Sequence, residues 1–350
     1  DAVLLQRHAA GGERAIELMS ATKSVVAMAV GCLLHEGRLD SLDAPIHRWY
    51  PEWKQGRKQQ ISLRMLMDHS SGLQNDPRAH AEIYPAPDGV QLALAAELDS
   101  APGERFAYNN KATNLIAGVV ERAAGEALDA LAQRCLFDPL GIADIEWERD
   151  QAGQPRVMAG LSMRASDLAA LGRLLLDDGR RGDRRLLPEG YAAQLFAASS
   201  ASTESGLLWW RVPAYLRYHV DPAHRQQAIE RGAPAELVNA LAPLDGHRFE
   251  GQDALMQALA GTLGPEWQTR WAQGLRASGL GPAALFRVEV GPIVAYAAEG
   301  YLGQALVLVP DADLVAVRQI ASRPDHTDAQ NFADFRRQVL AVAQALQTPP

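Results

Sequence analysis

The chain has 350 residues, of which 47% are hydrophobic, and its net charge at pH 7 is -8. This length and composition predict a globular protein with a sizeable core. Acidic and basic residues are interspersed, which argues against a nucleic-acid surface and favours small-molecule partners. The longest apolar run, 25–34, is too short for a membrane span, which needs about 20 residues.

The two cysteines of the chain are Cys32 and Cys135. Cys32 falls within an apolar helical segment, so we expect no disulfide framework, and neither position has the spacing of a metal site. No targeting segment is visible before the first predicted elements, so the sequence leaves both a cytoplasmic and a periplasmic location open.

The first third of the chain predicts one strand and several helices. Residues 2–8 are expected to form a strand, with a turn at Gly11 and Gly12. A helix is predicted to begin near Ser20 and to end before Gly37, a residue typical of the position after a helix. This helix is apolar on all sides, which predicts that it is buried.

Further elements follow in chain order. Helical spacing is found in the segments 61–69, 90–98, 112–125, 127–135, 167–178 and 188–198, so the central block is expected to be almost wholly helical. A candidate strand lies at 206–210, and residues 213–282 have no strand pattern. Strands return at 284–290, 292–297, 304–309 and 314–320, and a helix over 331–346 closes the chain.

Strands at both ends with helices between them predict an α/β (α+β) fold, in which helices flank an antiparallel sheet. We expect the sheet domain, with the helix after Ser20, to comprise residues 1–40 and 284–350. A mainly helical subdomain that leads back to the sheet would comprise 41–212, and a helical insertion would comprise 213–283.

Ser20 and Lys23 are the first candidates for chemistry. Residues three apart are neighbours on a helix, so this spacing places a hydroxyl beside an amine at the positive end of a helix dipole. The apolar helix is expected to desolvate Lys23, which would lower its pKa and make it a better base. The alternative is an N-capping serine with a solvated lysine.

Two later turns offer possible partners for this pair. Tyr108 lies on a predicted turn, where its phenol could face a cleft, and Asn110 could orient a lysine or a substrate carbonyl. Gly300 and Tyr301 lie between two predicted strands, where backbone N–H groups could form an oxyanion hole. Taken alone, these segments are more typical of a plain turn and a plain hairpin loop.

The order of these three segments resembles the serine β-lactamase and penicillin-binding-protein superfamily, particularly its class C-like branch of esterases and 6-aminohexanoate-dimer hydrolases. Ser-x-x-Lys is a known signature of this superfamily. Further segments that carry the resemblance are 37–43, 61–73, 139–141 and 161–168. The resemblance covers about residues 1–210 and 284–346, and it implies a β-lactamase/transpeptidase-like fold.

The resemblance also implies roles for individual residues. Ser20 resembles the nucleophile that becomes acylated, Lys23 the base, and Tyr108 the second proton-transfer group. Asn110 resembles the residue that orients Lys23 and the substrate. The oxyanion hole would combine the N–H of Ser20 with one near Gly300 or Tyr301. No metal and no cofactor are implied.

The sequence departs from β-lactamases at the third motif, where a cationic side chain is expected on a strand. The segment 295–300 reads Ala-Tyr-Ala-Ala-Glu-Gly and carries none. This difference favours a serine hydrolase that acts on esters or small amides. A β-lactamase or D-amino-acid peptidase, an acyltransferase and a catalytically silent binding scaffold are the alternatives. The segment 213–282, which the resemblance does not cover, is expected to be a lid or a dimerisation element, so a homodimer stays open.

Overall fold

The computed structural model describes residues 2–8, 12–76, 78–264, 266–276, 282–322 and 333–347. The chain divides into two compact units, of which the larger comprises Asp1–Val212 with Ala295–Pro350 and the smaller Pro213–Val294. None of the helices in the described ranges is long and apolar enough to cross a membrane.

The larger unit is built on a four-stranded sheet with the order β12-β11-β10-β6. Its strands are β6 (Trp210–Pro213), β10 (Ile293–Gly300), β11 (Gln304–Val309) and β12 (Leu314–Arg318). The pairs β10–β11 and β11–β12 are antiparallel, and Gly300 pairs with Gln304 across a three-residue turn. Leu302 and Gly303 in this turn have positive φ values of 68° and 89°.

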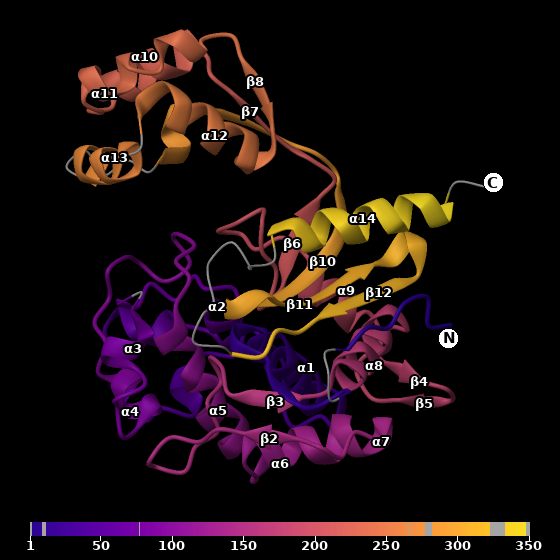
Figure 1. Ribbon diagram of the computed structural model, residues 1–350. Coiled ribbons are helices and arrows are strands. Elements are labelled where there is room, and N and C mark those ends of the chain that lie inside the picture. Colours follow the sequence, from indigo (N-terminus) through magenta and orange to yellow (C-terminus); the bar gives the residue numbers. More distant parts are fainter. Residues whose placement is uncertain are drawn as a thin grey trace. The chain divides into compact units, whose positions relative to one another are not determined.

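Helices cover both faces of this sheet (Figure 1). Alternate residues of a strand point to opposite faces. Val307 and Val309 therefore pack against Val339 of α14 (Ala333–Gln347). Leu306 and Leu308 join the main core on the other face, where α8 (Ala165–Leu176) packs against β11 and β12. The predicted antiparallel sheet flanked by helices is confirmed.

The central helix of this core is α1 (Thr22–His35), and the segment from Thr22 to Leu33 is entirely buried. Its composition explains this placement, because a helix that is apolar on all sides has no face suited to water. The chain leaves the helix at Gly37, whose φ of 66° is the left-handed conformation that glycine adopts at low cost. The predicted end of this helix is confirmed.

The neighbouring helix α5 (Asn110–Ala124) also contacts α1. The side chain of Asn109 caps it by accepting a hydrogen bond from the N–H of Ala112 at 2.8 Å. The other helices of the larger unit are α2 (Leu63–Met67), α3 (Ala79–Glu82), α4 (Gly89–Leu94), α6 (Leu128–Ala132), α7 (Asp138–Leu140) and α9 (Tyr191–Phe196), with a π-helical turn at Gln133–Phe137.

Short strands interrupt the helical block, which was predicted to be almost wholly helical. A three-stranded sheet has the order β1-β3-β2, and β4 pairs with β5. Their bounds are β1 (Ile16–Glu17), β2 (Glu146–Trp147), β3 (Leu161–Met163), β4 (Arg180–Arg181) and β5 (Arg184–Arg185). Strands of two or three residues are too short to give a readable alternation in the sequence.

The smaller unit has a core of its own around Trp267, Trp271 and Phe286. Its antiparallel sheet has the order β8-β7-β9, and its elements are β7 (Leu216–His219), β8 (Arg248–Glu250), β9 (Arg287–Val290), α10 (Pro222–Glu230), α11 (Ala235–Asn239), α12 (Gly251–Leu263) and α13 (Trp267–Arg276). The prediction that residues 213–282 lack strands is therefore wrong. The proposed role of this segment as a lid or dimerisation element stays a prediction.

The strand predicted over residues 2–8 is absent from the structure, in which this described segment has no regular secondary structure. Val3, Leu4 and Leu5 are exposed. A strand needs a partner to satisfy its backbone groups, and no described strand pairs with this segment. The apolar run alone was not sufficient evidence for a strand.

The expectation concerning the cysteines is also corrected. Cys32 and Cys135 form a disulfide across 103 positions of sequence, with their Cα atoms 6.3 Å apart. Cys32 is near the end of α1, and Cys135 lies in the π-helical turn that packs against this helix. Two cysteines do not form a framework, but one bridge requires only that the fold bring them together.

Candidate active site

Ser20 lies on a tight turn between a strand and the buried helix α1. The turn is a 3₁₀ segment, Met19–Ala21, and α1 begins at Thr22. Strand β1 pairs with β3, and the N–H of Leu18 donates to the carbonyl of Leu161 at 2.8 Å. Met19 has a φ of 50°, an unusual conformation for a side chain of this size. The sheet and the helix thus fix both ends of the turn that presents Ser20.

Lys23 follows on the first turn of α1 and faces Ser20. Its Nζ lies 3.0 Å from the Oγ of Ser20 and donates to the carbonyl of Met158 at 2.6 Å. The side chain is buried, and this burial lowers the pKa of Lys23, although the nearby Tyr108 opposes the shift. A desolvated amine close to a hydroxyl can serve as a proton acceptor.

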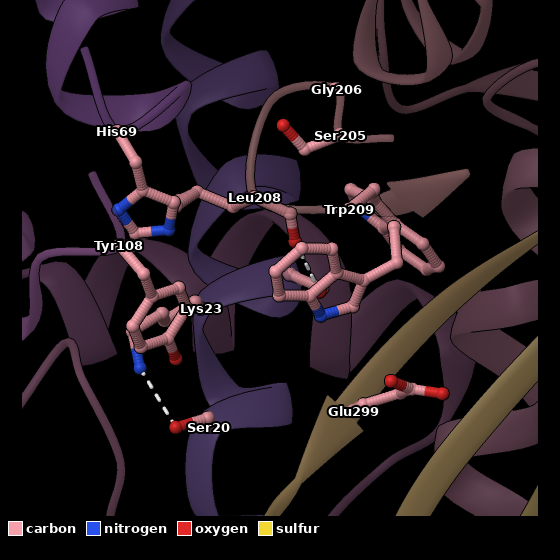
Figure 2. Close-up of a pocket in the computed structure, with 11 residues that line it drawn as sticks. Ser20, Lys23, His69, Tyr108, Ser205, Gly206, Leu208, Trp209 and Glu299 are labelled. Atoms are coloured by element: carbon pink, nitrogen blue, oxygen red, sulfur yellow. Dashed lines mark hydrogen bonds between the residues drawn. The ribbon is translucent and has the colours of Figure 1, made fainter. Parts of the chain in front are cut away.

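Tyr108 is brought to the same place from a distant part of the chain. The Nζ of Lys23 lies 5.2 Å from the centroid of its ring. Tyr108 and Trp210, the first residue of β6, stack with ring centroids 6.1 Å apart. Figure 2 shows Ser20, Lys23 and Tyr108 grouped at one end of the pocket that they line.

Asn110 occupies a different kind of position. It is the first residue of α5, and its Oδ1 is buried without a hydrogen-bond partner among the described residues. Asn110 does not belong to the lining of the pocket that contains Ser20. Its predicted role in orienting Lys23 and the substrate stays a prediction.

Gly300 packs directly against the turn that carries Ser20. A β-carbon at Gly300 would lie 2.2 Å from the carbonyl oxygen of Leu18 and 3.0 Å from the backbone nitrogen of Ser20. Glycine therefore allows the end of β10 to approach the turn. Tyr301 follows Gly300 with 60% of its surface exposed. The predicted oxyanion hole involves these neighbouring segments and stays a prediction.

His69, Trp210 and Glu299 are among the residues that line the pocket but were not predicted as site residues. His69 stood in the sequence only as part of the 61–73 segment. Trp209 is buried, at 2% exposure, although it also lines the pocket. Trp210 differs because it is the first residue of a strand beside Tyr108, a contact that the sequence pattern does not reveal.

Buried charge in the pocket wall comes from Glu299. Burial raises the pKa of this carboxyl, and the ion pair with Arg336 of α14 acts in the opposite direction. No group of three or more potential metal ligands occurs among the His, Cys, Asp and Glu residues within the described ranges. The reactive groups that the site brings together are a hydroxyl, an amine and a phenol.

Comparison with known proteins places this geometry in a family. A family model described as Beta-lactamase matches residues 6–341. Esterase EstB of Burkholderia gladioli is 34% identical over 36% of this chain and 37% of its own length. The 6-aminohexanoate-dimer hydrolase of Paenarthrobacter ureafaciens is 27% identical over 54% of this chain and 53% of its own length. The chain thus aligns with between about a third and a half of the length of these two relatives.

Solved structures share the fold at low sequence identity. A candidate beta-lactamase from Bacteroides dorei superposes with a TM-score of 0.64 and 18% identity, over 98% of this chain and 91% of that protein. A beta-lactamase from Mycobacterium bovis gives a TM-score of 0.56 and 16% identity, over 96% and 88% of the two chains. These similarities establish the β-lactamase/transpeptidase-like fold.

Proposed function

The chain belongs to the beta-lactamase family, and from this premise we propose that it is a serine hydrolase that cleaves esters or small amides through an acyl-enzyme. The observation that carries the proposal is the 3.0 Å contact between the Oγ of Ser20 and the Nζ of the buried Lys23. A serine hydroxyl is a weak nucleophile unless a neighbouring base accepts its proton. The lowered pKa of Lys23 suits it to that task.

In the proposed reaction, neutral Lys23 takes the proton of Ser20 while the Oγ of Ser20 attacks the substrate carbonyl carbon. The carbonyl oxygen becomes an oxyanion, which backbone N–H groups near Ser20 and Gly300 stabilise. Tyr108 passes a proton to the leaving alcohol or amine as the bond to carbon breaks. Lys23 then reprotonates Tyr108 and is neutral again. Water attacks the acyl carbon and gives a proton to Lys23, and the Oγ of Ser20 takes that proton back as the carboxylic acid product leaves.

The pocket wall favours an uncharged acyl group. Tyr108 and Trp210 present stacked aromatic rings, and the segment 295–300 supplies no cationic side chain for a substrate carboxylate. Ser205 also lines the pocket, and its hydroxyl has no hydrogen-bond partner among the described residues. A substrate carboxylate would therefore find no counter-ion from the segment 295–300, whereas a neutral ester or amide needs none.

The names of the two relatives, an esterase and a 6-aminohexanoate-dimer hydrolase, support both halves of the proposed substrate class. A β-lactamase or D-amino-acid peptidase, an acyltransferase and a silent binding scaffold are the alternatives. Hydrolysis of a chromogenic cephalosporin or a D-alanyl peptide, in place of neutral esters, would favour the first. Transfer of the acyl group to an added alcohol or amine in preference to water would favour an acyltransferase. Failure of a fluorophosphonate probe to label Ser20 would favour a silent binding scaffold.

The decisive test is the variant Ser20→Ala, assayed with p-nitrophenyl acetate and butyrate. We expect hydrolysis to fall to the uncatalysed background, because the substitution removes the hydroxyl that lies 3.0 Å from the Nζ of Lys23. Ser166→Ala, which alters an exposed serine of α8, is the matched control and should leave turnover unchanged.

Two further measurements make the outcome clear. Circular dichroism and the thermal midpoint should be the same for both serine variants and the unaltered protein. A fluorophosphonate probe should add its mass to the unaltered chain, at the peptide containing Ser20, and fail to label Ser20→Ala. Turnover retained by a folded Ser20→Ala variant would mean that the nucleophile lies elsewhere.

A further inference from the structure

His69 hydrogen bonds to the chain on both sides of Tyr108. Its backbone carbonyl accepts a hydrogen bond from the N–H of Ala107 at 2.8 Å, and its ring nitrogen Nδ1 accepts one from the N–H of Asn109 at 3.2 Å. The two residues that flank Tyr108 are therefore bound to a single residue about 40 positions earlier in the chain. Such a double contact restricts both the position and the direction of the intervening side chain.

The ring of His69 also packs against the ring of Tyr108. Their centroids are 4.6 Å apart with planes inclined at 40°, and the ring of Phe106 meets His69 edge-on at 5.8 Å. His69 is 4% exposed, so the surrounding residues hold it in turn. Figure 2 shows the imidazole next to Tyr108, on the side away from Ser20.

The hydrogen bond from Asn109 fixes the protonation state of the His69 ring. A nitrogen that accepts an amide proton must itself be unprotonated. Burial, together with the charge of the nearby Lys23, lowers the pKa of His69 to about 3. The imidazole is thus neutral at ordinary pH, and its contribution is geometric.

We propose that His69 is a positioning residue, which holds Tyr108 beside Lys23 and Ser20 through its hydrogen bonds to Ala107 and Asn109. The inference rests on the proposed function, because it assumes that Tyr108 transfers a proton there. His69 has a φ of 58°, and histidine and asparagine are among the side chains most often found in this left-handed conformation. The strained backbone turns its carbonyl and its ring toward the same short segment.

The test compares His69→Asn with His69→Leu. Asparagine tolerates a left-handed backbone, and its Oδ1 occupies the place of Nδ1, one bond from Cγ, so it keeps the acceptor for Asn109. Leucine places a methyl group there and removes the acceptor. We expect kcat for p-nitrophenyl butyrate to fall about 100-fold in His69→Leu, as for a catalytic group displaced by about 1 Å. KM should change little, and His69→Asn should recover most of kcat.

Hydrogen exchange at two amides provides a readout that does not depend on activity. The amide of Asn109 should exchange faster in His69→Leu than in His69→Asn, while the amide of Ala107 should stay protected in both, because its acceptor is a backbone carbonyl. If the unaltered protein hydrolyses no substrate, the proposed function fails, but the exchange result still tests the contact.

The outcomes separate clearly. Recovery of both kcat and Asn109 protection in His69→Asn, with thermal midpoints equal for the two variants, supports positioning of Tyr108. Equal kcat in His69→Leu and the unaltered protein would overturn the proposal. A second result would also overturn it: kcat is equally low in both variants, although the amide of Asn109 is still protected in His69→Asn. The hydrogen-bond acceptor at position 69 would then have no effect on turnover.

Discussion

Replacement of Gly300 by alanine should impair catalysis through the turn that carries Ser20. Gly300 has an extended backbone, with φ at −137° and ψ at 158°, which alanine adopts readily. The added β-carbon would lie 2.2 Å from the carbonyl oxygen of Leu18, 2.9 Å from the Cβ of Met19 and 3.0 Å from the nitrogen of Ser20. Two of these three atoms belong to the backbone, so no side chain can simply rotate away.

The size of the effect follows from the required movement. Ordinary contact begins at 3.4 Å, so the oxygen of Leu18 and the new β-carbon must separate by about 1.2 Å. A misplacement of about 1 Å in a reacting group costs about 100-fold in rate. We therefore expect kcat/KM to fall about 100-fold, equivalent to about 2.7 kcal/mol of transition-state stabilisation.

Two other glycines serve as controls in the same esterase assay. Gly261 in α12 has no atom within 4 Å of the position that a β-carbon would take, so Gly261→Ala should be neutral. Gly172 in α8 would meet the side chains of Leu306, Leu308 and Val315 at 2.9 Å, so Gly172→Ala should lower the thermal midpoint without a comparable loss of kcat/KM. Unaltered kcat/KM in Gly300→Ala would refute the close packing of β10 against the turn.

Two further predictions concern Lys23 and the disulfide. Because burial lowers the pKa of Lys23 and only the neutral amine accepts a proton, kcat should fall as the pH drops through that lowered pKa. In Lys23→Arg, which cannot deprotonate, kcat should be about 10²- to 10⁴-fold lower at pH values above that pKa, and the fall should be absent. An unchanged pH profile in this variant would exclude Lys23 as the base. The Cys32–Cys135 bridge can be removed by reduction or by Cys135→Ser, and its loss should lower the free energy of unfolding, measured in urea, by about 2–4 kcal/mol. Equal urea midpoints with and without reductant would show that the bridge adds no stability.

What could be predicted from the sequence depended on the distance along the chain between interacting residues. Ser20 and Lys23 are three residues apart at the start of a helix, so their spacing predicted that they are neighbours, and their Oγ and Nζ atoms lie 3.0 Å apart. The strands after residue 284 were recognisable because each alternates or forms a continuous apolar run next to a turn. Gln304–Val309 matches its predicted bounds.

Contacts between distant segments could not be predicted in this way. The hydrogen bond from Asn109 to His69 joins residues 40 positions apart, and the bridge between Cys32 and Cys135 spans 103. Neither pair lies on one element, so no periodicity connects them. The resemblance to a family supplied the association of Tyr108 with Ser20, which the residues alone left as one of two interpretations of a turn.

Backbone strain is concentrated at the candidate site. Six non-glycine residues in the described chain have positive φ, and two of them, Asp178 and Asp313, are neither part of the pocket lining nor next to Ser20 or Gly300. The other four are Met19 beside the nucleophile, His69 and Leu208 in the pocket lining, and Leu302 in the turn after Gly300.

Each such residue costs on the order of 1–3 kcal/mol and persists only where its surroundings determine it. The buried helix α1 and the sheet supply those surroundings. Leu18, which Gly300 approaches, and Leu302, in the turn after Gly300, are both buried. The large apolar core therefore has a role beyond stability. It holds four strained turns in the one arrangement that brings the hydroxyl, amine and phenol together, and the proposed catalysis depends on that arrangement.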